Sequence, residues 1–534
     1  MADESPLHCV IGSGPAGVAC AHALRGRGAQ VMMLDAGLSL EPDRVALISE
    51  MRKTSPAAWT REQIARIKEG TSATAKGLPL KLLYGSDFPY RDCDESLGTE
   101  YDGVGVRASF AKGGLSTVWG AAMLPYVQRD IANWPISLSE LNQHYAAVAE
   151  FAGFSVKSDD LETLFPLFQP NPAALNLSSQ AKILLNRLEK NRAVLSDAGI
   201  RFGQARIAVK VARPPHSDGC VYCGLCMYGC PYGFIYNSET TLEQLQSRPG
   251  FTYRPGVIVT ALRETSNNIE IEGYHRSNRE PFRMQARRAY LAAGIVPTTQ
   301  ILLRSLSFHD QPVAMKDSQY FLVPLALTKS AGDVTKEALH TLSQLFVEIF
   351  DPKISPRTVH LQIYSYSDLI GQAIRRSFGP LAKPLEPLAR SLERRLLIVQ
   401  GFLHSDDSAA IATTLTKSAS GERLKLQSRV TAHSKKIIGE VIRKLLRHGR
   451  QFGAYPIRPM LQIADPGRGI HSGGAFPMSA QPGPLETDTL GRPRGWQRLH
   501  AVDATVLPSI PATTITYSVM ANAHRIGWNS PGLD

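Results

Sequence analysis

Long apolar runs are absent from this chain of 534 residues, and cysteine is scarce. The longest near-apolar segments, such as Leu396–Val399, are far shorter than the roughly 20 residues that cross a bilayer, so no membrane-spanning helix is expected. The first residues show no basic stretch followed by an apolar run and a cleavage site, so we expect no secretory signal. Seven cysteines, an odd number with four close together, argue against a disulfide framework. These features predict a cytoplasmic protein.

The charge is unevenly placed, although the composition (43% hydrophobic, 20% charged) is that of a globular protein with room for two or more domains. Much of the net charge of +12 lies in residues 372–399 and 432–451. In the second segment apolar residues recur at helical spacing: Ile438, Val441, Ile442, Leu445 and Leu446. Such basic helices suit peripheral contact with an anionic membrane or an acidic partner, or a core helix with a solvated basic face. Only one aromatic residue, Phe378, lies among these charges, and no known nucleic-acid-binding module is present, so nucleic acid is not expected as a partner.

The segment 8–37, HCVIGSGPAGVACAHALRGRGAQVMMLDAG, reads as strand, tight turn, helix and strand. Gly12, Gly14 and Gly17 form the pattern G-x-G-x-x-G, which allows a tight turn, backbone approach to a pyrophosphate, and close packing of helix on strand. The free N–H groups of the helix N-terminus favour the diphosphate. Asp35 follows Gly12 by 23 residues, where an acid that binds ribose is expected. The sequence therefore predicts a dinucleotide site.

Four further segments identify the type of dinucleotide. They are AKGGLSTVWGAAMLP at 111–125, YLAAGIVPTTQILLRS at 290–305, HSGGAFPM at 471–478, and LHAVDATVLPSIPATTITYSVMANAHRIG at 499–527. Together with the N-terminal motif, and in this order, they resemble the glucose–methanol–choline (GMC) flavoprotein oxidoreductases. Residues 306–455 carry no such resemblance.

The resemblance implies that the bound dinucleotide is FAD. Its ADP half would lie on Gly12, Gly14, Gly17 and Asp35. The other cofactor-binding positions implied are Gly113, Gly114, Ser116, Val257 and Asp503. Some members attach FAD covalently through a histidine in a Ser-Thr-His-Trp segment. Val118 occupies that histidine position here, so the FAD is expected to be non-covalent.

The catalytic positions follow from the same resemblance. His471 matches the histidine of the His-x-x-Gly segment, and a histidine that titrates near neutrality suits a general base. The second family position, a histidine or asparagine six residues after Pro508, is Thr514 here. A threonine can donate a hydrogen bond to the substrate but cannot take up a proton at pH 7. Either His471 does all the acid–base work, or another residue such as His404 or Tyr364 contributes.

Four cysteines form the run Cys-x2-Cys-x2-Cys-x3-Cys-Pro: Cys220, Cys223, Cys226 and Cys230. This is the spacing of a bacterial ferredoxin loop and predicts a [4Fe-4S] cluster that relays electrons. Cys230 either completes the same cluster or is free, with Cys93 in its place. Zinc is an alternative, although zinc sites usually pair two Cys-x-x-Cys units across a longer loop. Cysteines without metal are a third reading, because long-chain alcohol oxidases of the family carry a similar stretch.

The expected fold is α/β: an FAD-binding Rossmann-like domain of GMC type and a substrate domain with a mixed or antiparallel sheet. The FAD-binding domain would comprise residues 1–135, 205–305 with a cysteine-rich insert at 214–240, and 456–534. The substrate domain would comprise residues 136–204 and 306–455.

The expected function is an FAD-dependent dehydrogenase that acts on a CH–OH group of a sugar, polyol or lipid-like alcohol. His471 would be the base, hydride would pass to flavin N5, and electrons would leave through the cluster. The external carrier would be a ferredoxin-like protein or a quinone. A flavin/iron–sulfur reductase, a non-redox lyase on the same fold, and a membrane-docked electron-transfer flavoprotein at the inner face of the membrane remain alternatives.

Overall fold

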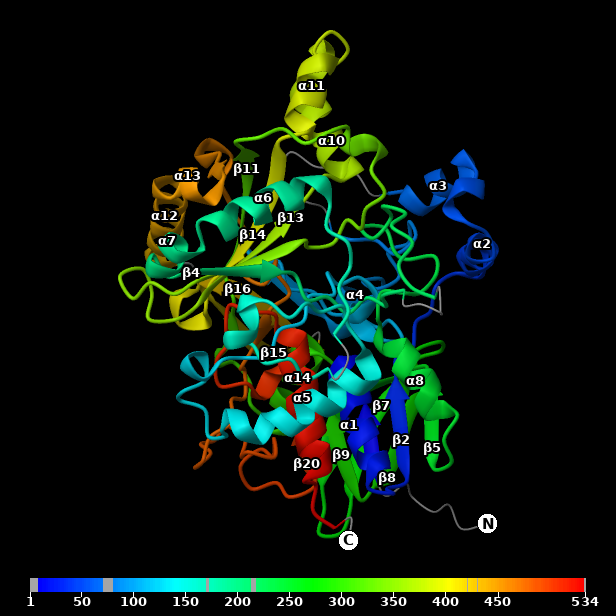
Figure 1. Cartoon of the computed structure of the whole chain (residues 1–534). Helices are drawn as coiled ribbons and strands as arrows, with labels where there is room; N and C mark the ends of the chain where they lie inside the picture. The colour runs from blue at the N-terminus through cyan, green and yellow to red at the C-terminus, as the bar shows by residue number, and fades with distance from the viewer. Residues whose placement is uncertain are drawn as a thin grey trace.

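The computed structural model describes residues 8–70, 80–169, 172–212, 218–419, 421–429 and 431–532. Residues 214–217 of the expected cysteine-rich insert therefore lie outside the described part. Figure 1 shows two tiers: a parallel sheet flanked by helices below, and a large antiparallel sheet above. Within the described ranges, no helix has the length and apolar character needed to span a membrane.

The lower tier is built around a five-stranded sheet of order β20-β9-β1-β2-β5. All its neighbouring strands are parallel. The strands are β1 His8–Ile11, β2 Val31–Asp35, β5 Phe251–Pro255, β9 Arg288–Leu291 and β20 Leu499–Ala501. Parallel strands covered on both faces are expected to be mostly apolar, and the fully buried β1 and β20 are apolar except for one buried histidine each, His8 and His500. An antiparallel ribbon of β6 Val257–Glu264, β7 Ile269–His275 and β8 Pro281–Ala286 adjoins this sheet.

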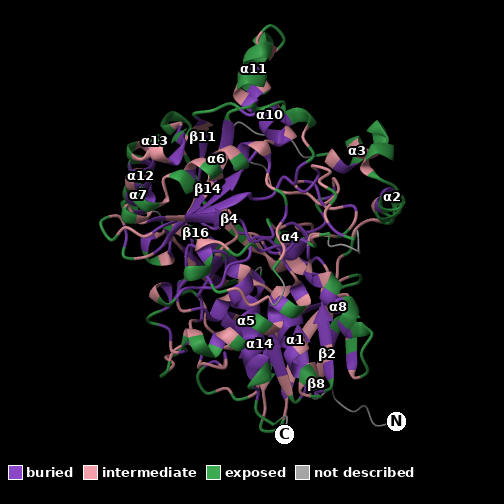
Figure 2. Cartoon of the chain, viewed as in Figure 1, coloured by how far each residue is buried: buried purple, intermediate pink, exposed green. Residues whose placement is uncertain are grey.

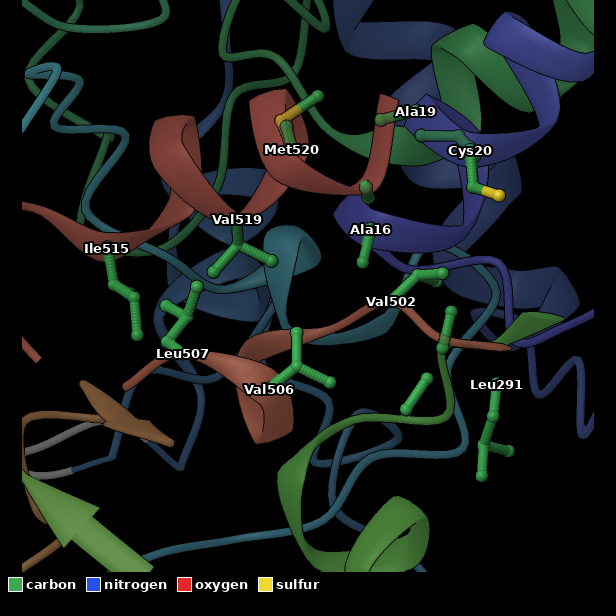
Figure 3. Packing of buried hydrophobic residues seen from close by; sticks show 14 of the residues in the cluster. Ala16, Ala19, Cys20, Leu291, Val502, Val506, Leu507, Ile515, Val519 and Met520 are labelled. Carbon is green, nitrogen blue, oxygen red and sulfur yellow. The ribbon is translucent and has the colours of Figure 1, made fainter. Parts of the chain in front are cut away.

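Two helices from opposite ends of the chain pack together beside the parallel sheet. They are α1 Pro15–Gly26 and α14 Ile515–Trp528, with α5 Leu138–Ala152 packed on α14. In Figure 3 the small side chain of Ala19 on α1 faces Met520 on α14. Cys20 lies against Gly527 of α14, where an added Cβ would be 3.2 Å from Cys20 Sγ. Small residues on α1 allow this close packing, so the two ends of the chain complete one core.

The upper tier is a seven-stranded sheet with the order β17-β11-β14-β13-β12-β4, and β18 also pairs with β11. Its strands are β4 Ile200–Gln204, β11 Tyr320–Leu327, β12 Leu345–Ile349, β13 Val359–Tyr364, β14 Leu396–Phe402, β17 Ala454–Pro456 and β18 Gln462–Ile463. Alternate residues point to opposite faces of a strand. One face carries Val323, Leu361 and Val399 into an apolar core, whereas the other carries Gln362, Gln400 and Phe402 toward the lower tier.

The basic helix expected near residues 432–451 is α12 Ala432–Arg447. Its apolar residues Ile438, Val441, Ile442 and Leu445 are buried in the core of the upper tier. Lys435, Lys436, Arg443 and Arg447 lie on the exposed side. Of the two interpretations of this segment, the structure supports a core helix with a solvated basic face.

The other basic segment forms a projection at the top of the molecule, visible in Figure 1. It consists of α10 Asp368–Ser377 and α11 Glu386–Glu393, and Figure 2 shows α11 mostly exposed. Leu381 and Leu388 on this projection are 60% and 46% exposed. At its base, Asp368 accepts hydrogen bonds from Lys68 of α3 Arg61–Lys68 and from Tyr228 of the cysteine run.

A third sheet, with the order β19-β10-β15-β16-β3, joins the tiers at the side. Its strands are β3 Thr99–Asp102, β10 Val313–Asp317, β15 Ala410–Ser418, β16 Gly421–Arg429 and β19 Ser472–Gly473. β19 pairs with β10 and so fixes the backbone directly after His471. The division of the chain into five domain segments stays a prediction.

Candidate active site

One elongated cavity runs between the tiers. Its lower end is bounded by the glycine turn after β1, the end of β2 and the start of β6. Its upper end is bounded by the polar face of β13 and β14 and by segments near the C-terminus. Of the expected site residues, nine line it: Gly12, Gly14, Asp35, Gly114, Ser116, Val257, His471, Asp503 and Thr514. The motifs from both ends of the chain therefore meet in one space.

The glycine turn at the lower end has no room for side chains. Gly12 has φ +104°, and a Cβ there would lie 2.4 Å from the carbonyl oxygen of Ala292. Gly17 does not line the cavity; a Cβ there would lie 1.9 Å from the carbonyl oxygen of Gly12. Gly17 thus lets α1 pack on the turn, and the N-terminus of α1 is open to an anion in the cavity.

Asp35 is held in place by two hydroxyl groups. Ser13 Oγ donates to Asp35 Oδ2 at 2.5 Å, and Tyr253 OH donates to the same oxygen at 2.9 Å. Burial, opposed by these hydrogen bonds, raises the pKa of Asp35 to about 6. Gly113 does not line the cavity, but its N–H donates to Ser13 Oγ at 2.9 Å. Gly113 therefore acts on the site through Ser13 and Asp35.

Asp503 is buried beneath the turn that precedes α9 Ile295–Ser305. Its Oδ2 accepts hydrogen bonds from the N–H of Gly294 at 2.9 Å and from Thr298 Oγ1 at 2.5 Å. Burial raises the pKa of Asp503. Asp503 thus fixes the Ala-Gly turn that lines the cavity. Val118, at the position of the family's attachment histidine, also lines the cavity.

Arg107 was not expected at the site, although it is the single lysine or arginine among the described residues that line this cavity. Gln362 and Gln400, which pair across β13 and β14, were not expected there either. An isolated arginine in an unpatterned loop carries no sequence signal. The two glutamines could have been found only from strand alternation.

His471 lies at the upper end, where its ring stacks on Phe402 with 4.7 Å between ring centroids. Its Nδ1 is enclosed and has no hydrogen-bond partner among the described residues, so Nε2 is the nitrogen open to the cavity. Desolvation and, second, the charge of His360 lower the pKa of His471 to about 3. His471 is therefore neutral at pH 7, but it does not titrate near neutrality as expected, and burial makes it a weaker base than a free imidazole.

The other candidate acid–base groups differ in position. Thr514 lines the cavity, and its Oγ1 accepts the N–H of Leu124 at 2.7 Å, which leaves the hydroxyl proton free for donation. Tyr364 also lines the cavity and donates to Gln362 Oε1 at 2.9 Å. His404 does not; its ring nitrogens contact the backbone of Asp130 and Asp406.

The cysteine run surrounds a second, small cavity. Cys220, Cys223, Cys226 and Cys230 all line it, together with His340 and apolar side chains. Cys93 lies elsewhere, at the start of α4 Cys93–Leu97. Among the described residues no three potential ligands converge on a point where one metal ion would fit. Lys81 donates to the carbonyl of Trp119, which lines the first cavity, and burial lowers the pKa of Lys81 to about 8.

No model of a protein family matches the chain. The chain is 26% identical over 314 residues to a 6'''-hydroxyparomomycin C oxidase of Streptomyces lividus, an alignment that covers 56% of this chain and 50% of that protein. The chain thus spans about half the length of this curated relative.

Solved structures match the whole fold. Pyridoxine 4-oxidase from Mesorbium loti matches with a TM-score of 0.57 at 13% identity, over 98% of both chains. Formate oxidase from Aspergillus oryzae RIB40, solved in a study of FAD modification, matches with a TM-score of 0.62 at 13% identity, over 99% of this chain and 98% of that one. The predicted α/β fold class, a Rossmann-like parallel sheet combined with a mixed or antiparallel sheet, is confirmed.

Proposed function

We propose that this protein is an FAD-dependent oxidoreductase of the GMC family that acts on a CH–OH group. The main observation that supports this proposal is that one cavity begins at the glycine turn of α1 and ends at His471. A dinucleotide on the turn would extend toward His471, so that its reactive end and a substrate meet there. The oxidase names of the relative and of the structural neighbours support this proposal.

The residues present fit FAD. The turn at Gly12 excludes every side chain larger than hydrogen, and Asp35 and the N-terminus of α1 suit the ribose and the diphosphate. Arg107 is the cation available to the diphosphate within the described lining. When bound, FAD supplies a hydride acceptor. Val118 offers no nucleophile, so the attachment is proposed to be non-covalent.

The chain's own residues manage the proton and hold the substrate. His471 accepts the proton of the substrate hydroxyl on Nε2, because this nitrogen is unprotonated and open to the cavity. Thr514 donates a hydrogen bond to the same oxygen. Gln362 and Gln400 offer amide donors and acceptors to further hydroxyl groups. This polar upper end favours a sugar or polyol over a lipid-like alcohol.

We further propose an iron–sulfur cluster in the second cavity, held by Cys220, Cys223, Cys226 and Cys230. A zinc ion needs its sulfur ligands about 2.3 Å from one centre, which the side-chain arrangement does not provide. The observation that supports a cluster is that all four thiols line one cavity. This cavity, of about 20 Å³, would have to widen to hold iron and sulfide atoms. The role of the cluster would be to pass electrons to a ferredoxin-like protein or a quinone, from a cytoplasmic enzyme.

The test is anaerobic mixing of the purified holoenzyme with D-glucose, glycerol, benzyl alcohol and paromomycin, followed by absorbance. Bleaching of the flavin band by at least one alcohol is expected. Turnover without bleaching would instead support a non-redox lyase. Rapid reduction by a partner protein, with no alcohol active, would support an electron-transfer flavoprotein. A carbonyl compound that reoxidises the reduced flavin would show that the enzyme works as a reductase.

A further inference from the structure

Two ionisable side chains lie on the cavity-facing side of the upper sheet, behind His471. Glu348 of β12 and His360 of β13 are directly opposite each other in the antiparallel ladder, and both are 0% exposed. Glu348 Oε1 and His360 Nδ1 are 2.6 Å apart. Burial of two ionisable groups carries a desolvation cost, and apolar residues at both positions would be expected to make a core at least as stable. Stability alone therefore does not explain this pair.

The pair is connected to His471. Phe402 stacks on both histidine rings, with centroid distances of 6.1 Å to His360 and 4.7 Å to His471. His360 Nε2, His471 Nδ1 and Glu348 Oε2 are buried without partners among the described residues. Buried polar atoms are nearly always hydrogen-bonded to protein or to ordered water. The rings of His360 and His471 both stack on Phe402, and a water that bridges His360 Nε2 and His471 Nδ1 would satisfy both nitrogens.

We propose that Glu348 and His360 form the proton acceptor behind His471, which rests on the proposed function of His471 as base. The O–H bond of the substrate breaks as Nε2 of His471 gains the proton. The proton on Nδ1 of His471 then moves, through one water, to Nε2 of His360. His360 releases its Nδ1 proton to Glu348, which becomes a neutral carboxylic acid, and His471 is left neutral with the substrate's proton on Nε2.

The charges around the pair suit this role. Burial raises the pKa of Glu348, and the carboxylate of Asp130 acts in the same direction, whereas His360 and Arg206 oppose it. Arg201 is the cross-strand neighbour of Glu348 on β4. Glu348 therefore takes up a proton more readily than an exposed glutamate does. The pair can hold the proton while the flavin is reduced, before it is released again.

The test is a reduced-minus-oxidised infrared difference spectrum of the FAD-loaded protein, with dithionite as reductant. In the wild type a carboxylic-acid carbonyl band that shifts in D2O is expected on reduction, because the added negative charge draws a proton onto Glu348. Glu348→Gln should lose this band. Glu393→Gln should keep it, since Glu393 is equally buried but pairs with Arg375 away from the cavity. His360→Gln should also lose it, because the route is interrupted.

A wild type without the band, or a band retained in Glu348→Gln, would overturn the inference. Loss of the band in Glu393→Gln would show that it reports on carboxyl burial in general and would also overturn it. If the protein binds no FAD, the proposed function itself is wrong. This outcome is distinct from a failure of the proton relay alone. If Glu348→Gln does not fold, His360→Gln alone decides, and a retained band there overturns the relay.

Discussion

The protonation state of His471 determines how activity should depend on pH. An unperturbed histidine with a pKa near 6.5 would be about 97% protonated at pH 5, which would lower a base-dependent rate about 30-fold. The pKa of His471 is lowered to about 3, so the neutral base persists as the pH falls and is lost only near that value. We expect the rate constant of flavin reduction to change less than about twofold between pH 8 and pH 5. A steep fall centred near 6.5 in stopped-flow measurements would contradict this burial effect.

The effect of removing His471 on the rate of flavin reduction can be compared with the effect of removing a matched histidine. His471→Ala is expected to keep its flavin and to lose flavin reduction by substrate by a factor of about 100 to 10,000. His404→Ala removes another buried histidine that does not line the cavity, so its reduction rate should stay near that of the wild type. An equal loss of the reduction rate in both variants would indicate that the substitutions disturb folding and would contradict the role of His471 as base.

Val118 leads to an expectation about the cofactor linkage. Acid precipitation should release free FAD into the supernatant, because the position of the attachment histidine holds a side chain that cannot bond to the flavin. A yellow pellet with a colourless supernatant would show covalent attachment through another residue.

Single residues differed in how well the sequence could locate them. Gly12 and Asp35 lie in a local pattern whose spacing is set by one turn and one helix, so their places followed from the sequence. Glu348 and His360 are 12 residues apart and meet only through antiparallel register. Thr514 was expected at the active site but could be given no partner, because Leu124 lies 390 residues away.

At the scale of elements, the cysteine loop carries a prediction about metal content. Anaerobically purified protein should contain about four iron and four sulfide per chain if the cluster is cubane. Cys223→Ser should lose the iron yet still allow flavin reduction by substrate. Cys93→Ser, a buried cysteine outside the loop, should keep the iron. Iron-free wild type with rapid peroxide production would identify an oxidase with a structural cysteine loop.

The two basic helical segments should behave differently at a membrane. The apolar face of α12 is buried, so membrane contact would have to use the α10–α11 projection. Weak binding to phosphatidylglycerol vesicles that fades with salt is expected, because charges act over about 8–10 Å at physiological ionic strength. Leu381→Ser with Leu388→Ser should abolish binding in a flotation assay, whereas Lys435→Ala with Lys436→Ala should not. Equal binding by all variants would refute a role for the projection.

The molecule as a whole should be stabilised by its cofactor. The proposed FAD site joins three distant parts of the chain, near Gly12, Val257 and His471, so bound FAD should favour the folded state. At a free concentration 100 times the Kd, the free energy of unfolding should rise by about 2.7 kcal/mol. Thermal unfolding with added FAD should show an upward shift, and NAD at the same concentration should not match it. An unchanged midpoint would contradict the proposed site.

The fold class was predictable because the motifs of the lower tier are local and ordered along the chain. The upper sheet was not predictable in detail. Its strands come from segments as distant as β4 and β17, and their pairing depends on contacts that no local pattern encodes. The core role of α12 was likewise left open, since helical periodicity identifies an apolar face but not what covers it.

The lower sheet also constrains how the protein is made. β9 ends at Leu291, but it remains without its outer partner β20 until Leu499 has been synthesised. At roughly 5–20 residues per second, a ribosome needs on the order of 10–40 s to cover that interval. During this time the nascent chain carries an exposed parallel edge and cannot close the site on a cofactor. Loading must therefore follow translation, and chains terminated before β20 should be substrates for chaperones and proteases.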